Sequence, residues 1–438
     1  MGDFMVGDKR YVVPTFWQRQ NFSLLPSGSP GTRARGNDEP MSQELYDRIQ
    51  PAVKLATLLL QLAEDLFTRI LFAEIVGLDK KRPNSFPYFG LDPHYTITDT
   101  DRQRYRQIMT GAHPRLRFFL ANFDIRPVGK TWGDTLAIGS LNKLQIDVRI
   151  SKCYYDFFAH PRYADLLPGL KARNLLELAT TLLHELGHAV YDLRRCHDVD
   201  GAPRIFQGQK PGRILREPCY HPSHTFTYLD RRELERAVEF SLFGGALQTL
   251  ITPEPAFTDQ WATVPGFVYT MGMVCLYIRP MLMDEIQRGL QLKALDQAVI
   301  EAALDMNTWA ILLRQIEPEE VKHAAMLGGV IDIMGRIDRL MSTGVLSTPF
   351  VKVYDRDDLA DTDDDFVRAQ KLMALQNPHT TWMAFLRMSP LQERDRRHDS
   401  EGKEEKVLYG IEHKAAPKSG LLRRFWGKAT MSLLALLA

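Results

Sequence analysis

The feature that most constrains the fold is a run of apolar residues over positions 175–195, spaced three and four apart as in a helix. Apolar side chains stand on nearly every side of this helix: Leu178, Leu182, Leu183, Leu186, Ala189 and Val190. A helix that is apolar all round is stable only when other elements cover it. We therefore expect a buried helix inside a globular domain with a substantial core.

Two histidines and a glutamate stand close together within this stretch: His184, Glu185 and His188. Their spacing puts both imidazoles on one face of the helix, one turn apart, where they can bind the same metal ion. Glu185 is then placed to take a proton from a water molecule on that ion. The alternative is a chance pattern of ordinary surface or core histidines, because two of its five positions are free. Buried imidazoles and a buried carboxylate need partners, which favours the metal.

Residues 184–188 resemble the active-site helix of the zincin metallopeptidases, whose signature is His-Glu-x-x-His following a small sheet. The resemblance implies a zinc ion, with Glu185 as the catalytic base and a strand near the helix, for which residues 144–150 are the match. The longer metzincin signature is absent. Arg194 stands where that family has its third histidine, and Tyr191 stands where it has glycine.

Zincins of the gluzincin type take the third ligand from a glutamate on a later helix. Residues 231–250 offer Glu233, Glu235 and Glu239. We expect Glu239, because its neighbours in the sequence are apolar and a carboxylate in such surroundings is costly unless it is paired or bound to a cation. Glu235 is the alternative ligand, with Glu239 then accepting a hydrogen bond, although a charge-paired helix start also explains Glu233 and Glu235. The run over 239–245 also resembles uncharacterised zincin-like proteins of fungi.

The segment between these two helices, residues 195–230, holds further candidates. A histidine is an alternative third ligand, and a histidine or tyrosine is expected to stabilise the oxyanion, although an ordinary polar loop is the simpler interpretation. These residues are His197, His221, His224, Tyr220 and Tyr228. Asp192, one turn beyond His188, either orients an imidazole or is an exposed acid at a helix end. Cys196 and Cys219 are expected to be structural, since cysteine is unusual in catalytic sites of this type.

The rest of the chain predicts an α+β fold that is mainly helical, a zincin-like domain with a small mixed sheet beside the active-site helix. Alternating apolar residues over 135–150 predict a short hairpin with its turn near Asn142. Helical spacing recurs over residues 42–76 (one helix or two in line, interrupted by Pro51), 99–122 (broken at Pro114), 232–250, 268–290 and 317–341.

Composition along the chain divides it into three parts. Residues 1–41, rich in Ser, Pro, Gly and Arg from residue 18 onward, are expected to be a flexible segment. Residues 42–346 form the zincin-like metallohydrolase domain, and residues 347–438 form a charged, partly disordered extension. The extension ends in a short amphipathic helix over 421–438, for which weak contact with a membrane surface or a partner stands beside a docking helix or a frayed tail.

The charge balance excludes some classes of partner. Lys plus Arg number 55 against 54 Asp plus Glu, so no net field favours nucleic acid. The four cysteines form no Cys-x-x-Cys pair, which argues against a disulfide framework and a thiolate zinc site. The first ten residues lack the apolar core of a secretory signal, and we expect an intracellular, cytoplasmic protein.

These observations predict a zinc metallopeptidase in which His184, His188 and Glu239 bind the ion and Glu185 activates water. Two alternatives remain. One is an enzyme of the same fold that acts on a small molecule or a biosynthetic intermediate, because loops around the metal set specificity. The other is a non-catalytic metal-binding or scaffold protein, against which the intact Glu185 argues, since a structural site needs no base.

Overall fold

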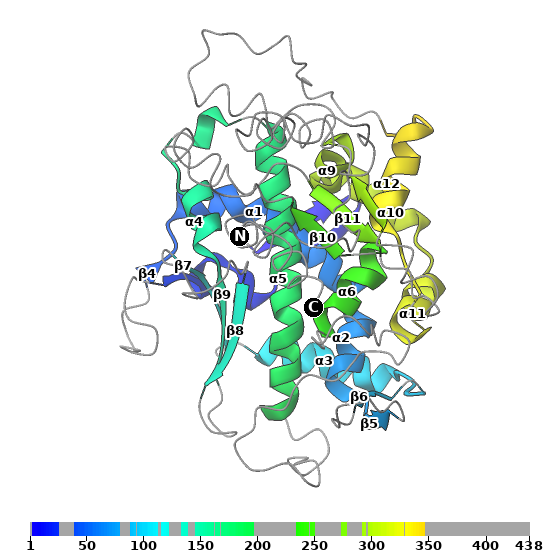
Figure 1. Ribbon diagram of the computed structural model, residues 1–438. Helices are drawn as coiled ribbons and strands as arrows, with labels where there is room; N and C mark the ends of the chain where they lie inside the picture. Colours follow the sequence, from blue (N-terminus) through cyan, green and yellow to red (C-terminus); the bar gives the residue numbers. More distant parts are fainter. Residues whose placement is uncertain are drawn as a thin grey trace, which may run out of the picture.

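The computed structural model describes residues 2–25, 39–78, 88–92, 94–112, 115–121, 133–138, 145–161, 163–166, 168–196, 234–244, 246–249, 273–277, 291–294, 297–327 and 329–346. The described residues are mainly helical, with small sheets, as the sequence predicts. The long helix α5 (Pro168–Cys196) runs through the middle of the molecule (Figure 1). The largest sheet lies on one side of α5, and the later helices lie on the other (Figure 1).

The N-terminal residues are part of the core, which corrects the expectation of a flexible segment over 1–41. Residues 2–25 form the hairpin β1 (Asp3–Val6) and β2 (Lys9–Val12), two short turns η1 (Thr15–Trp17) and η2 (Arg19–Asn21), and strand β3 (Phe22–Leu25). Phe16, Trp17 and Phe22 are buried in the main apolar cluster. The aromatic side chains of this segment supply the burial, whereas the composition rich in Ser, Pro and Gly is concentrated in residues 26–38. Residues 26–38 lie outside the described residues.

The expected helix over 42–76 is two helices, α1 (Gln43–Leu62) and α2 (Glu64–Phe72). Ser42 caps α1 by accepting a hydrogen bond from the backbone N–H of Leu45. Pro51 lies inside α1, and the break comes instead at Ala63, between the two helices. Beyond α2 the chain turns into β5 (Ile75–Leu78), which pairs with β6 (Tyr88–Leu91).

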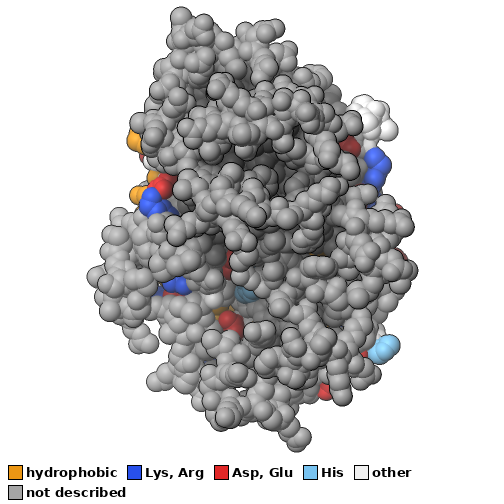
Figure 2. Space-filling model, viewed as in Figure 1, with side chains coloured by type: hydrophobic (Ala, Val, Ile, Leu, Met, Phe, Trp, Pro, Cys, Tyr) orange, Lys and Arg blue, Asp and Glu red, His pale blue; other side chains and the backbone are white. Residues whose placement is uncertain are grey.

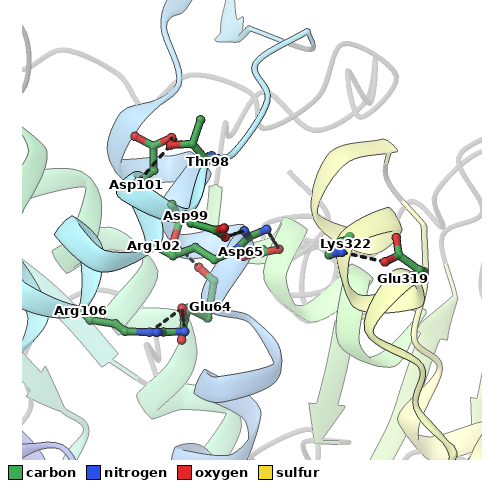
Figure 3. Close-up of polar contacts among 10 residues, drawn as sticks. Glu64, Asp65, Thr98, Asp99, Asp101, Arg102, Arg106, Glu319 and Lys322 are labelled. Carbon is green, nitrogen blue, oxygen red and sulfur yellow. Dashed lines mark hydrogen bonds and ion pairs between the residues drawn. The ribbon is translucent and has the colours of Figure 1, made fainter.

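Helix α3 (Asp99–Gly111) is shorter than the predicted helix over 99–122, because residues 116–121 form strand β7 (Leu116–Ala121). Thr98 and Asp101 make a reciprocal capping box at its start. Ion pairs fasten α3 to α2: Arg102 binds Asp65, and Arg106 binds Glu64 (Figure 3). Arg102 and Arg106 of α3 therefore help to hold the two helices together.

The largest sheet has five strands in the order β4-β3-β7-β9-β8. It is mixed: β3 and β7 are parallel to their neighbours β7 and β9, whereas β4 (Glu39–Pro40) and β8 (Gly133–Ile138) run antiparallel at the two edges. Strand β8 pairs with β9 (Gln145–Ile150), so the predicted hairpin over 135–150 is confirmed, while its turn lies outside the described residues. Ile146, Val148 and Ile150 are buried, as their alternation predicts.

Helix α5 follows the short helix α4 (Lys152–Phe158) and the turn η4 (Tyr163–Asp165), and it confirms the helix predicted over 175–195. It contacts α1, α2 and α9 as well as the strands β8 and β9. The apolar residues on its several sides are buried, which follows from being covered by helices and a sheet at once.

Three later predictions need correction. The helix expected over 232–250 ends as α6 (Leu234–Phe243), because Gly244 takes a left-handed conformation with φ of 74°, and β10 (Ala246–Thr249) follows. Residues 273–277, expected to be helical, form strand β11 (Met273–Tyr277) between β10 and β12 (Gln291–Ala294). The helix over 317–341 is two helices, α11 (Pro318–Leu327) and α12 (Ile333–Ser342), and Asp332 caps the second.

Helices α9 (Gln297–Leu304) and α10 (Met306–Gln315) lie between β12 and α11 in the chain. No described helix is long and apolar enough to cross a membrane. The extension over 347–438 and its expected amphipathic helix lie outside the described residues, so the predicted domain boundary at 347 stays a prediction.

Candidate metal and catalytic site

Helix α5 carries a buried polar stripe, and the candidate site is its C-terminal part. Its polar residues lie between positions 173 and 188. They occupy less than half of the helix circumference, because each residue turns the helix by about 100°. Such burial of polar side chains is costly unless each has a partner. The stripe consists of Arg173, Asn174, Glu177, Thr180, Thr181 and Glu185, which are all buried, and the half-buried His184 and His188.

The two histidines lie against each other on this stripe. Their ring centroids are 5.4 Å apart, with the ring planes at 73°. The side chain of His184 is 23% exposed, so the pair is accessible although the residues around it are buried. The four-residue spacing that the sequence shows is therefore realised as two adjacent imidazoles on one helical turn.

Glu239 approaches this pair from α6, which packs against α5. Its Oε1 lies 2.7 Å from Nδ1 of His184, and its side chain is 9% exposed. Glu239 is thus the residue that the structure brings to the histidines from the later helix. The contact fits two arrangements: Glu239 as a ligand beside His184, or Glu239 as the acceptor that orients a ligand imidazole through its other ring nitrogen.

Glu185 points to the sheet rather than to α6. The hydroxyl of Thr135, on β8, donates a hydrogen bond to Oε2 of Glu185 at 2.7 Å. The start of β8 is so close that a Cβ atom at Gly133 would lie 2.5 Å from Oε1 of the same carboxylate. Glu185 is therefore held by β8, whereas Glu239 reaches His184 from α6.

The site contains more buried acid than fixed positive charge. Glu185 is 5% exposed and Glu239 is 7% exposed. Among the described residues, no lysine or arginine pairs with either carboxylate, and their partners are the hydroxyl of Thr135 and the imidazole of His184. Burying a carboxylate without an opposite charge is unfavourable, so this arrangement attracts a cation or a proton. Histidine and acidic side chains are visible near the centre of the face that Figure 2 shows.

The donor types suit zinc, but their spacing is not that of a closed metal site. Among the described residues, no group of three or more His, Cys, Asp and Glu side chains is arranged to hold an ion. Two atoms bound to one tetrahedral zinc lie about 3.3 Å apart, given bonds of roughly 2.0 Å. The 2.7 Å contact between His184 and Glu239 is shorter, so zinc would have to separate the two groups by a few tenths of an ångström.

Several predicted candidates are not placed. Glu235 belongs to α6, but its side chain is outside the described part of the chain. Asp192, in contrast, is described: it is half-buried on α5, one turn beyond His188. Also outside the described residues or side chains are Glu233, His197, His221, His224, Tyr220, Tyr228, Cys196 and Cys219.

Two site residues were missed by sequence reasoning: Gly133 and Thr135. Both stand on one face of β8, because side chains alternate along a strand. The signal in the sequence was the presence of two small residues two positions apart, because a strand that packs closely against a helix needs small side chains on that face. Nothing local to residues 184–188 indicates this contact, which joins positions 50 residues apart.

Comparisons with family models, with curated proteins and with solved structures find no match for this chain. The resemblance to the zincins therefore stands on the motif over 184–188 and on its surroundings.

Proposed function

We propose that this chain is a zinc-dependent hydrolase of the zincin type that cleaves peptide bonds. His184, His188 and Glu239 hold the ion, and Glu185 is the catalytic base. The observation that carries the proposal is the meeting of two adjacent imidazoles and two buried carboxylates that no described lysine or arginine neutralises. Two histidines and one glutamate are a usual ligand set of catalytic zinc, which keeps a further position open.

The chain's own residues would divide the work as follows. Bound zinc supplies a Lewis acid that polarises a carbonyl group and lowers the pKa of water at the site. His184 and His188 are fixed by the rigid α5, and Glu239 reaches them from α6. Glu185 takes the proton of the attacking water at its carboxylate and passes it to the leaving amine. The buried surroundings strengthen each of these electrostatic interactions.

The position of β8 supports a peptide as the substrate. Strand β8 is an edge strand, with β9 on one side and no described strand on the other. An exposed edge can pair with an extended peptide through main-chain hydrogen bonds. Because Thr135 of β8 contacts Glu185, a peptide added at this edge would pass beside the base.

The test combines metal analysis with a substitution of the base. We expect the purified full chain to contain zinc and to hydrolyse members of a diverse peptide library until a chelator is added. Glu185→Gln keeps the shape of the side chain but cannot accept the proton, so turnover should fall at least about 100-fold while zinc is retained. Glu64→Gln makes the same chemical change on α2, at its ion pair with Arg106, and should leave turnover unchanged.

Each alternative gives a different result. Zinc-dependent activity on small molecules without peptide cleavage would indicate an enzyme for a biosynthetic intermediate. A structural metal site would give a third result. Zinc would be lost only when the protein unfolds, and both wild type and Glu185→Gln would be fully stable and without turnover. A wild-type chain that binds no zinc would overturn the proposal.

A further inference from the structure

The contact between β8 and Glu185 has two components, one polar and one steric. Thr135 donates its hydroxyl hydrogen to Oε2 of Glu185 at 2.7 Å, the usual length of a strong O–H···O bond. The same hydroxyl oxygen lies 3.2 Å from the backbone carbonyl of Glu185, and the shorter contact takes the single hydrogen. At Gly133, an added Cβ would lie 2.5 Å from Oε1 and 2.6 Å from Cγ of Glu185. The missing side chain at 133 therefore makes room for the carboxylate.

The strand that carries these two residues is itself well fixed. Gly133 pairs with Ile150, and Thr135 pairs with Val148, in the antiparallel register of β8 and β9. Both partners are fully buried in the core. The hydroxyl of Thr135 is half-buried and reaches Glu185 from a rigid backbone, so it can restrict a flexible glutamate at little further entropic cost.

Only one oxygen of Glu185 is used in this contact. Among the described residues, Thr135 is the one donor to the carboxylate, and it binds Oε2. Oε1 lies over Gly133, where there is no side chain to occupy the adjacent space. Thr135 thus holds one oxygen, and no described group donates to the other, so that Oε1 keeps its lone pairs for accepting a proton.

We propose that Thr135 is a positioning residue for Glu185, with Gly133 providing the space in which the held carboxylate works. This inference rests on the proposed hydrolase function, because it assigns a purpose to the orientation of its base. It also assigns β8 a role in catalysis through Glu185 rather than through direct contact with reacting atoms.

Kinetics of three variants test the role. Thr135→Val keeps the shape but removes the donor, so kcat should fall about tenfold with KM changed less than about twofold. Thr135→Ser keeps the hydroxyl and should restore most of kcat. Gly133→Ala should push the carboxylate away and lower kcat further than Thr135→Val, with zinc content unchanged in all three. Equal activity of the Val and Ser variants, or loss of zinc in Thr135→Val, would overturn the positioning role.

A double-mutant cycle in urea measures the contact without relying on activity. In chelator-treated protein, Thr135→Val should lower the folding equilibrium constant about tenfold, but about twofold or less when Glu185 is already alanine. Absence of this coupling overturns the inference while leaving the hydrolase proposal intact. Coupling without any chelator-sensitive hydrolysis in the wild type overturns the proposed function, and the positioning role with it, and leaves Thr135 as a structural partner. Coupling together with the kcat loss supports both.

Discussion

Five acidic side chains are buried among the described residues, and four of them fall into two groups with different partners. Asp65 and Asp147 are 7% and 2% exposed, and each faces an arginine. Arg102 binds Asp65 through two nitrogens at 2.7 and 3.0 Å (Figure 3), and Arg117 lies 3.1 Å from Asp147. Glu185 and Glu239 are buried to a similar extent, yet the partners that the described chain gives them are a hydroxyl and an imidazole.

The difference separates acids that hold the fold from acids that are available for chemistry. An arginine that forms two hydrogen bonds fixes a carboxylate and cancels its charge. A hydroxyl or an imidazole can orient a carboxylate, but neither carries the permanent positive charge of an arginine. Glu185 and Glu239 therefore lack the fixed counter-charge that Asp65 and Asp147 have among the described residues, and a divalent cation would supply it.

The largest effect that distinguishes the two groups should be on zinc affinity. In the proposed zinc site, Glu239→Gln removes an oxygen ligand, so zinc affinity should fall more than about 100-fold, beyond the cost of losing a partner that only orients a ligand. Asp147→Asn, a comparable change at an arginine-paired acid, should leave affinity unchanged. Titration of the chelator-treated protein with zinc measures both. A larger loss in Glu235→Gln than in Glu239→Gln would make Glu235 the ligand and Glu239 the acceptor from His184.

Stability should respond in the opposite way. Asp65→Asn leaves Arg102 without its buried counter-charge, and the free energy of unfolding should fall by about 2 kcal/mol, less than for a fully buried pair because Arg102 is 21% exposed. Glu239→Gln has no arginine to leave behind among the described residues, so in chelator-treated protein the change should stay below about 1 kcal/mol. Urea unfolding of the two variants measures this. Equal losses in the two would erase the distinction between the groups.

The sequence predicts those parts of the fold and the site in which the signal is local. The helix carrying His184 and His188 follows from apolar spacing, and the hairpin over 135–150 follows from alternation. Glu239 was singled out by its apolar neighbours, and the structure places it 2.7 Å from His184. In each case the signal lies in the residues of the predicted segment itself.

Other parts depend on contacts between distant segments. The apolar run over 273–277 fits a buried strand as well as a helix. It forms a strand because it pairs with β10 on one side and β12 on the other. Residues 116–121 follow the break at Pro114 and extend because β3 and β9 pair on both sides of β7. The role of Thr135 depends on where β8 lies against α5, which no spacing within either segment specifies.

The smallest effect concerns a second hydroxyl–carboxylate pair, which lies in solvent. Thr98 donates to Oδ2 of Asp101 at 2.6 Å, as Thr135 does to Glu185, but Thr98 is exposed at the start of α3 (Figure 3). Burial raises the pKa of Asp101, but the hydrogen bonds from Thr98 and Tyr95 outweigh it, and the net pKa lies below the ordinary value. Because a carboxyl group with a lowered pKa stabilises the fold above its unfolded pKa, that stability is lost as the pH falls through the folded value.

Thr98→Ala should therefore cost about 1 kcal/mol at neutral pH, the usual worth of a helix cap. Part of that cost should disappear below about pH 4, because protonated Asp101 no longer gains from the donor. Urea unfolding at pH 7 and at pH 3 measures the difference. Thr135→Val should cost more than Thr98→Ala at neutral pH, since a buried carboxylate that loses its donor cannot turn to water. If Thr98→Ala and Thr135→Val lowered the free energy of unfolding equally, burial would not be the reason for a strong contact at Glu185.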